Sequence, residues 1–360
     1  RTPYREKKAR VASPAGALRR REFARFLGSP TYMLNCGLGS VIGVAFAGFL
    51  LIRNSWAYEN LSVLSEAVGI GIPRFAPIAA AAVCMVLSTV AITAPSVSLE
   101  GRTIWLSQSL PVTPWQVLRA KLAVHLWVGG IPALLCGVAV AAALRLPLPT
   151  AVMTVILPLL FTLLQACFGL FVNLLHPNLT WVSEMTPIKQ SLGVLFSLLG
   201  GWGYAALLGV GGYFLTVPVP AWVALLALNL LTALLSLLLL RWRMNLLTLS
   251  PDEARAMGVH TDRLRLAVIL CATVLTASAV SVSGMIGWVG LVIPHLSRRL
   301  VGNDCRRLLP MACLFGAAFL LLVDDLARTL AATEIPIGIL TAFVGAPFFI
   351  YLMVKGGDRL

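Results

Sequence analysis

Long apolar stretches recur along this chain and leave it few choices of fold. Hydrophobic residues make up 59% of the 360 residues, charged residues only 12%, and the mean hydropathy is +0.89. Soluble domains do not reach such values, whereas a chain that crosses a bilayer needs about 20 apolar residues for each helical span. Backbone groups that face lipid must also bond within their own helix. The sequence therefore predicts an all-α polytopic membrane protein.

Ten apolar segments are candidate transmembrane helices. Their predicted ranges are 32–52, 75–95, 120–143, 150–174, 191–215, 220–240, 264–283, 285–297, 309–327 and 336–354. The eighth is short, because its residues cover only roughly 20 Å of a hydrocarbon core that is ~30 Å thick. Half-spans of this kind are tolerated where protein or a water-filled cavity surrounds them, and they often mark a transport pathway. Close helix packing through small residues is the alternative.

The basic residues predict the orientation of these spans. In the ten-span arrangement, 24 of the 28 Lys and Arg residues lie on the same side as both termini. The exceptions are Arg53, Arg74, Arg145 and Arg328. Because Lys and Arg collect on the inner side of a membrane, both termini are predicted to be cytoplasmic. The same asymmetry explains the net charge of +14 as a topology signal that contacts anionic lipid headgroups, so no nucleic-acid partner is inferred.

Two predicted cytoplasmic loops contain signals for short helices. In SPDEARAMG, Ser250 can cap a helix that has Pro251 at its first position and ends at Gly258. In SLEGRTIWLSQSLPVTPWQVLRAK, Thr113 and Pro114 repeat the same device. Such helices suggest surfaces for a soluble partner, although each could instead lie at the headgroup interface. For a third amphipathic stretch, residues 18–27, the interfacial interpretation is favoured.

The chain shows no set of residues that would carry catalysis. It lacks a P-loop, an H-E-x-x-H motif and a G-x-S-x-G motif, and its four histidines are scattered. Its seven cysteines contain no C-x-x-C pair, so neither a disulfide framework nor a metal site is predicted. Asp324 and Arg328 are spaced to form a structural ion pair, and a role in a transport pathway is weighed equally. We expect no catalytic residues and no cofactor.

From about residue 245 onward the chain resembles the permeases of ABC importers for iron-siderophores, haem and cobalamin. The resemblance rests on four strings in fixed order, which are NLLTLSPDEARAMGV, GMIGWVGLVIPHLSRRLVGNDCRRLLP, LLVDDLAR and EIPIGILTAFVGAPFFIYLM. It implies that a cytoplasmic loop docks into a separate ATPase subunit, and the matching residues are Asp252, Glu253, Ala254, Arg255 and Gly258. It also implies a helix near the translocation pathway, which corresponds to Gly284, Gly287, Gly290 and Pro294.

Residues 15–240 instead resemble the later six-span half of an ABC exporter permease. The strings that carry this resemblance are REFARFLGSPTYMLN, SVSLEGRTIWLSQSLPVTPWQVLRAKL and LFVNLLHPNLTWVSEMTPIKQS. The loop with the second helix signal is a second possible ATPase-coupling loop, with Glu100, Gly101, Arg102 and Pro114 as its candidate residues. The expected organisation is a basic cytoplasmic or interfacial segment at 1–31, a six-span region at 32–240 and a four-span region at 241–360. The two pieces meet near residues 241–245, as a natural hybrid, a fragment or a fusion.

Together the resemblances imply a permease subunit of an ABC transporter in the bacterial inner membrane. Import of a metal chelate is favoured, because the importer motifs are the more specific ones, and an exporter permease is the alternative. A membrane scaffold or an intramembrane enzyme is the alternative from another class. The implied partners are ABC ATPase subunits, an extracytoplasmic substrate-binding protein, a second permease chain in a homo- or heterodimer, and the lipid membrane.

One prediction distinguishes a pathway role of the short span from a packing role. We expect a bulky substitution at Gly287 or Gly290 to abolish transport while binding of the ATPase survives, because the added side chain would obstruct the pathway. Transport assays and co-purification of the ATPase measure the two effects. Loss of folding in these variants would instead support close packing.

Overall fold

The computed structural model describes residues 14–69, 71–110, 112, 114–244, 286–329 and 338–343, together with residues 269, 272–273, 276, 280 and 347. Its regular elements in these ranges are all helical, which confirms the predicted all-α class. The chain divides into two compact units, Arg1–Ser236 and Leu237–Leu360. Helix α10, Ala221–Met244, includes the boundary between them.

Six helical segments of the described residues are long and apolar enough to cross a membrane. They are Pro30–Ile52 in α2, Gln116–Ala143 in α6, Leu148–Leu175 in α7, Met185–Leu215, which joins α8 and α9, Ala221–Leu239 in α10, and Cys305–Thr329 in α14. Each corresponds to a predicted span. A bent pair, Asn54–Ala67 and Ile72–Leu87, gives a seventh candidate with an angle of 103°. The predicted spans 264–283 and 336–354 lie largely outside the described residues.

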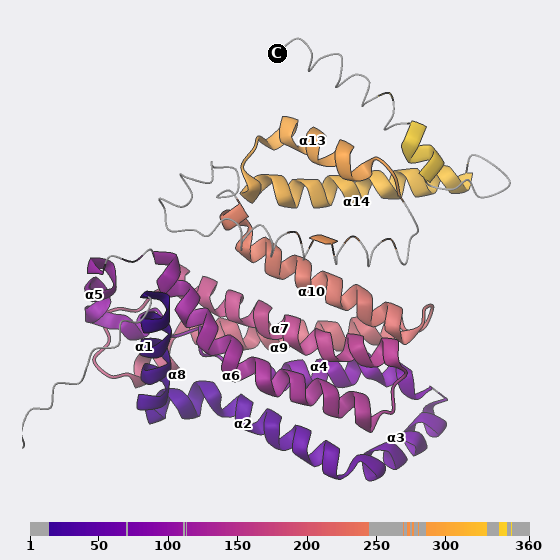
Figure 1. Cartoon of the computed structure of the whole chain (residues 1–360). Coiled ribbons are helices and arrows are strands. Elements are labelled where there is room, and N and C mark those ends of the chain that lie inside the picture. Colours follow the sequence, from indigo (N-terminus) through magenta and orange to yellow (C-terminus); the bar gives the residue numbers. More distant parts are fainter. Residues whose placement is uncertain are drawn as a thin grey trace, which may run out of the picture. The chain divides into compact units, whose positions relative to one another are not determined.

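The first unit is a bundle of long helices with its short helices at the two ends. Helices α2, α6 (Pro114–Ala143), α7, α9 (Leu192–Leu215) and the shorter α4 (Ala76–Leu87) run side by side (Figure 1). Helices α1 (Pro14–Gly28), α5 (Ile104–Ser109) and α8 (Met185–Lys189) lie at one end, and α3 (Asn54–Val68) lies at the other (Figure 1). The 3₁₀ helices η1 (Ile72–Phe75) and η2 (Ser98–Thr103) precede α4 and α5. The predicted cytoplasmic loop and the amino-terminal helix therefore share one end of the bundle.

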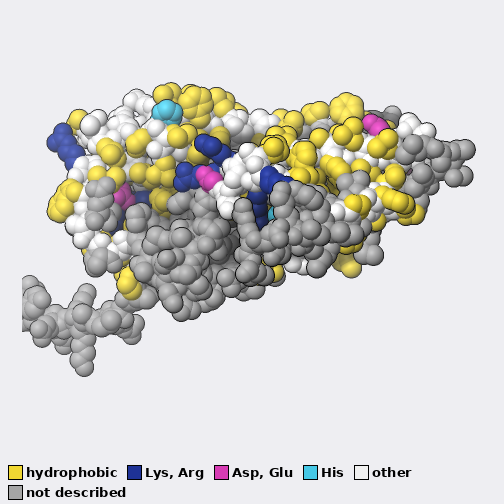
Figure 2. Space-filling view, turned by 90° about the horizontal axis from the view of Figure 1, so that it is seen from above, with side chains coloured by type: hydrophobic (Ala, Val, Ile, Leu, Met, Phe, Trp, Pro, Cys, Tyr) yellow, Lys and Arg dark blue, Asp and Glu magenta, His cyan; other side chains and the backbone are white. Residues whose placement is uncertain are grey.

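Large apolar side chains cover the outside of the helices, as a protein surrounded by lipid requires. On α2, Leu34, Leu38 and Val41 are all exposed. Figure 2 shows hydrophobic side chains in broad patches on the described surface, whereas charged side chains occur in a few small groups. The interior is built largely from small residues and a few large ones, among them Leu157, Phe161 and Leu208. Lipid, rather than water, is the solvent that this surface suits.

The predicted continuous span at 75–95 is wrong in its second half. Helix α4 ends at Leu87, and residues 88–97, which we call the break, are not helical. The hydroxyls of Ser88 and Thr89 donate to the carbonyls of Met85 and Val86, each at 2.6 Å, and such local bonds compete with continuation of a helix. Further on, Pro95 lacks the donor that a helix needs. A prediction from hydropathy alone does not detect these local signals.

Glycines on the neighbouring helices make room for the break. A Cβ atom on Gly39 of α2 would clash with the Thr89 hydroxyl and would lie 3.0 Å from Val90. A Cβ atom on Gly169 of α7 would lie 2.8 Å from the Thr93 hydroxyl and 3.2 Å from the Ala94 nitrogen. The irregular backbone therefore packs directly against helix backbone on two sides.

The short helix predicted to start at Pro114 is also wrong in extent. Pro114 is the first residue of a helix, as predicted, but that helix is α6 and continues for 30 residues to Ala143. The predicted cap, Thr113, lies outside the described residues. The short helix of this loop is α5, whose six residues precede the proline. The apolar span and the helix-start signal thus belong to one element.

In the second unit, α13 (Val289–Val301) packs against α14 (Cys305–Thr329). Trp288 precedes α13 with a left-handed backbone (φ 65°), and Pro294 lies inside the helix. Val292, Ile293 and Ser297 are the buried residues of α13. Only 6% of the most apolar part of α14 is buried, so this helix depends on lipid or on other protein for cover.

The close approach at Gly39 gives a stability prediction. We expect Gly39→Ala to lower the free energy of unfolding by about 1–3 kcal/mol, because the added methyl group overpacks the contact with the break. Gly48→Ala is the matched control on the same helix, since a Cβ atom there meets nothing within 4 Å. The control should be neutral or slightly stabilising. Thermal unfolding in detergent measures both, and equal behaviour of the two variants would contradict the packing described above.

Candidate functional site

The break between α4 and η2 is buried, and side chains from other helices bind its backbone. Between Ser88 and Ser98, every side chain except that of Thr89 is buried. The Tyr32 hydroxyl of α2 donates to the Ile92 carbonyl at 2.6 Å. The Ala91 N–H donates to the Cys36 carbonyl of the same helix at 3.2 Å. Helix α2 thus supplies partners for the middle of the break, which no longer has a helical pattern of its own.

One side chain, Asn173 of α7, holds the end of the break. Its Oδ1 accepts hydrogen bonds from the backbone nitrogens of Val97 at 2.8 Å and Ser98 at 3.1 Å. Its Nδ2 donates to the Ser98 hydroxyl at 2.8 Å. Asn173 is itself completely buried. A buried N–H without a partner costs about 1–3 kcal/mol, so this amide replaces the helical hydrogen bonds that the chain loses here.

Residues that follow α7 also bind Ser98, directly after the break. Trp181 donates its indole N–H to the Ser98 carbonyl at 2.6 Å, and the Asn178 backbone N–H donates to the Ser98 hydroxyl at 3.0 Å. Gly101 has a positive φ of 50°, and a Cβ atom there would lie 3.1 Å from the Trp181 ring. Glycine is therefore required at this turn for its conformation and for space.

A group of buried charges joins α1, η2 and α6 beside this turn. Lys121 of α6 lies 2.7 Å from Glu100 of η2 and 3.1 Å from Glu22 of α1. The side chains of Lys121, Glu100 and Glu22 are only 1%, 3% and 6% exposed. Arg21 and Arg25 of α1 approach both carboxylates at 3.5–3.9 Å and are about one third exposed. We call these five residues the ionic cluster.

The ionic cluster fixes where the amino-terminal helix lies. An isolated buried ion costs several kcal/mol, so the two carboxylates need the Lys121 ammonium together with Arg21 and Arg25, and Lys121 needs at least one carboxylate. The hydrophobic face of α1 supports this arrangement, because Leu18 and Phe26 are buried. Phe26 packs edge-on against Tyr32, with ring centroids 5.3 Å apart. The favoured interfacial interpretation of residues 18–27 describes only the opposite face, where Arg19 and Arg20 are exposed.

The four residues predicted for a second coupling loop occupy different environments. Glu100 and Gly101 are buried, Arg102 is exposed, and Pro114 begins α6. The exposed side chains of the loop at residues 98–109 include Trp105, which is 62% exposed. The exposed side chains of this loop therefore include Arg102 and Trp105, while Glu100 is buried against Lys121.

The residues predicted from the importer resemblance are only partly described. Asp252, Glu253, Ala254, Arg255, Gly258 and Gly284 lie outside the described residues. A Cβ atom on Gly287 or Gly290 meets nothing within 4 Å in the part of the second unit that the structure describes. Pro294 lies within α13. The predicted pair in α14 is formed, since the Arg328 Nε lies 3.0 Å from the Asp324 Oδ2.

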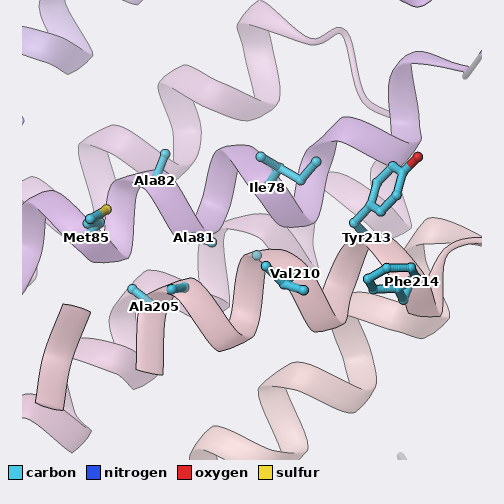
Figure 3. A pocket seen from close by; sticks show the side chains of 10 residues that line it. Ile78, Ala81, Ala82, Met85, Ala205, Val210, Tyr213 and Phe214 are labelled. Atoms are coloured by element: carbon cyan, nitrogen blue, oxygen red, sulfur yellow. The ribbon is translucent and has the colours of Figure 1, made fainter. Parts of the chain in front are cut away.

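A groove of about 440 Å³ lies between α4 and α9. Ile78, Ala81, Ala82 and Met85 line it from α4, and Ala205, Val210, Tyr213 and Phe214 line it from α9 (Figure 3). These side chains are apolar except for the Tyr213 hydroxyl. The groove suits hydrocarbon, and it offers no set of charged or polar groups that would bind a metal chelate.

Several residues that build this site were not predicted. Glu22, Lys121, Gln165 and Asn173 are buried, and His125 accepts or donates a hydrogen bond with the Thr93 hydroxyl at 3.2 Å. Lys121 and Gln165 stand within predicted spans, where polar residues are costly and require partners. The sequence therefore indicates that Lys121 and Gln165 have polar partners, although it does not identify those partners.

The comparisons with known proteins concern mainly the carboxy-terminal region. Residues 219–355 match the FecCD transport family. The molybdate import system permease protein MolB of Haemophilus influenzae is 53% identical over 119 residues, which are 32% of this chain and 35% of that protein. The hemin transport system permease protein HmuU of Yersinia pestis is 46% identical over 118 residues, with the same coverage of 32% and 35%.

A third relative is the cobalamin import system permease protein BtuC of Halobacterium salinarum, 49% identical over 110 residues, 31% of this chain and 30% of that protein. The chain thus spans about a third of the length of the curated relatives it matches. A solved chain described as a metal-chelate type ABC transporter covers 97% of this chain and 91% of its own, at 24% identity and a TM-score of 0.33. The exporter resemblance of residues 15–240 stays a prediction.

Asn173 gives a direct test of how the break is held. We expect Asn173→Leu to lower the free energy of unfolding by about 2–5 kcal/mol, because two buried N–H groups lose their acceptor. Asn35→Leu is the matched control, since the Asn35 side chain is exposed on α2 and donates only within its own helix. The control should unfold like the parent protein. Chemical or thermal unfolding in detergent measures both, and a stable Asn173→Leu protein would contradict the assigned role.

Proposed function

We propose that this chain is the membrane-spanning permease subunit of an ABC transporter that takes up a metal chelate. The observation that carries this proposal is the FecCD-family domain at residues 219–355. The polytopic helical fold is what a permease requires. The chain lacks a P-loop, so ATP would be hydrolysed by a separate ATPase subunit and this chain would not be an enzyme.

In this proposal, ATP binding closes the ATPase subunits and rocks the spans of the permease between inward- and outward-open states. Two loops offer surfaces for the ATPase. One contains Asp252–Gly258, and the other is loop 98–109, whose Arg102 and Trp105 are exposed. The second loop supports the proposal because it is preformed and anchored in the bundle, as a contact that transmits force must be.

The substrate class follows from the relatives, whose names include molybdate, hemin and cobalamin. Relatives with such different substrates share 46–53% identity with this chain over about the same length. The shared region therefore supports the transport mechanism rather than one substrate, and selection would fall to an extracytoplasmic substrate-binding protein. We propose a bacterial inner-membrane location and a homo- or heterodimer of permease chains.

An exporter permease is the second candidate. It is favoured by residues 15–240, whose strings resemble an exporter half, and by the compactness of Arg1–Ser236 as a unit. A substrate-binding protein encoded beside this chain would support import. An ATPase encoded there without a binding protein would support export.

The proposal predicts a physical complex. We expect an ABC ATPase encoded beside this chain to co-purify with it in detergent. The turnover of the complex should fall by about tenfold when Arg255 and Gly258 are both substituted, which corresponds to a lost coupling free energy of common size. Turnover of the ATPase alone is the control. If no ATPase associates under any nucleotide condition, the transporter proposal is wrong.

A further inference from the structure

Lys121 lies where α1 meets the break and the loop at residues 98–109, which directly follows the break in the chain. Its ammonium donates to the Ser96 carbonyl at 2.8 Å and to the Glu22 Oε2 at 3.1 Å, and it lies 2.7 Å from the Glu100 Oε1. A lysine has three N–H donors, so these three oxygens account for all of them. The three partners belong to the break, to α1 and to the loop at residues 98–109.

This arrangement leaves Lys121 little freedom. The side chain is 1% exposed, so water does not offer it an alternative partner. Attraction between buried charges is screened only weakly, and the ammonium therefore follows whichever carboxylate moves. The Ser96 carbonyl would then lose or keep its donor according to the position of Glu100.

The end of the break is held from the other side by Asn173. Ser96 bonds to Lys121 of α6, while Val97 and Ser98 bond to Asn173 of α7. Lys121 of α6 and Asn173 of α7 thus bind three consecutive residues, 96–98, with their side chains. Glycines leave the backbone of the break against α2 and α7 without intervening side chains. A shift of loop 98–109 relative to α6 would therefore act on the hydrogen bonds of this segment.

We infer that Lys121 is a positioning residue that transmits movement of loop 98–109 to the break inside the bundle. The inference rests on the proposed function, in which that loop receives the force of the ATPase. Movement of the loop reaches Lys121 through Glu100, because Glu100 belongs to the loop and its carboxylate contacts the ammonium directly. Lys121 passes the movement to the break through Ser96, whose carbonyl accepts its hydrogen bond near the end of the break, and Glu22 keeps α1 attached to both.

The first experiment uses the chain alone and needs no partner. Hydrogen–deuterium exchange of peptides covering residues 88–97 is compared between the parent protein, Glu100→Gln and Arg102→Gln. We expect Glu100→Gln to raise exchange in the break by about tenfold. Without the Glu100 charge, Lys121 is held less firmly and binds the Ser96 carbonyl less tightly, so the backbone of the break opens more often and its N–H groups exchange faster. Arg102→Gln is the matched control on the same loop, since Arg102 is exposed, and it should leave the break unchanged. Equal exchange in all three proteins overturns the inference.

The second experiment separates transmission from local stability. The same peptides are followed when ATP and magnesium are added to the complex with the co-purifying ATPase. In the parent complex, nucleotide should alter exchange in both loop 98–109 and the break. In the Glu100→Gln complex it should alter the loop alone. A break that still responds to nucleotide in this variant overturns the inference.

A variant without the three most buried charges keeps both tests informative if Glu100→Gln does not fold. The combination Glu22→Gln, Glu100→Gln and Lys121→Met removes all three buried charges at similar volume, an exchange that buried ion pairs often tolerate. It should bind the ATPase and fail to transmit the nucleotide response. A response like that of the parent complex overturns the inference. If no ATPase co-purifies with the parent protein, the proposed function is contradicted instead. The first experiment would then still decide whether Glu100 and Lys121 control the break.

Discussion

Backbone hydrogen bonding without water is the constraint on which this structure depends. Most of the chain satisfies it with helices, and residues 88–97 satisfy it in another way. Their N–H and carbonyl groups bond to the helix backbone of α2 and to the side chains of Tyr32, Lys121 and Asn173. Irregular backbone at membrane depth is tolerated only where protein encloses it, and the glycines of α2 and α7 provide that enclosure. The interruption of the α4 span therefore determines how its neighbours must be composed.

The spans were predictable because hydropathy is a property of each segment by itself. Helices α2, α6, α7, α9, α10 and α14 lie where the apolar stretches place them. The end of α4 at Leu87 was not predicted, because Ser88, Thr89 and Pro95 act through local geometry that a hydropathy average conceals. Pro114 marked a true helix start, but a start signal does not say how far a helix runs.

The candidate site could be predicted only at its surface. The sequence identified loop 98–109 and its Glu100, yet it did not indicate that Glu100 would be buried against Lys121. Pairing of this kind joins residues 99 positions apart, as between Glu22 and Lys121, and no spacing rule reaches so far. The match of residues 219–355 to the FecCD transport family, by contrast, was predictable because the motifs of the importer resemblance are local strings.

The position of Lys121 also has a consequence for biosynthesis. Glu22 emerges from the ribosome 99 residues before the ammonium that it binds, which at roughly 5–20 residues per second is a delay of several seconds. During that time the Glu22 carboxylate has only Arg21 and Arg25 of its own helix as charged partners within the ionic cluster. The contact of α1 with α6 through Lys121 can therefore form only after residue 121 has been synthesised, so α1 docks onto α6 later than its own place in the chain suggests.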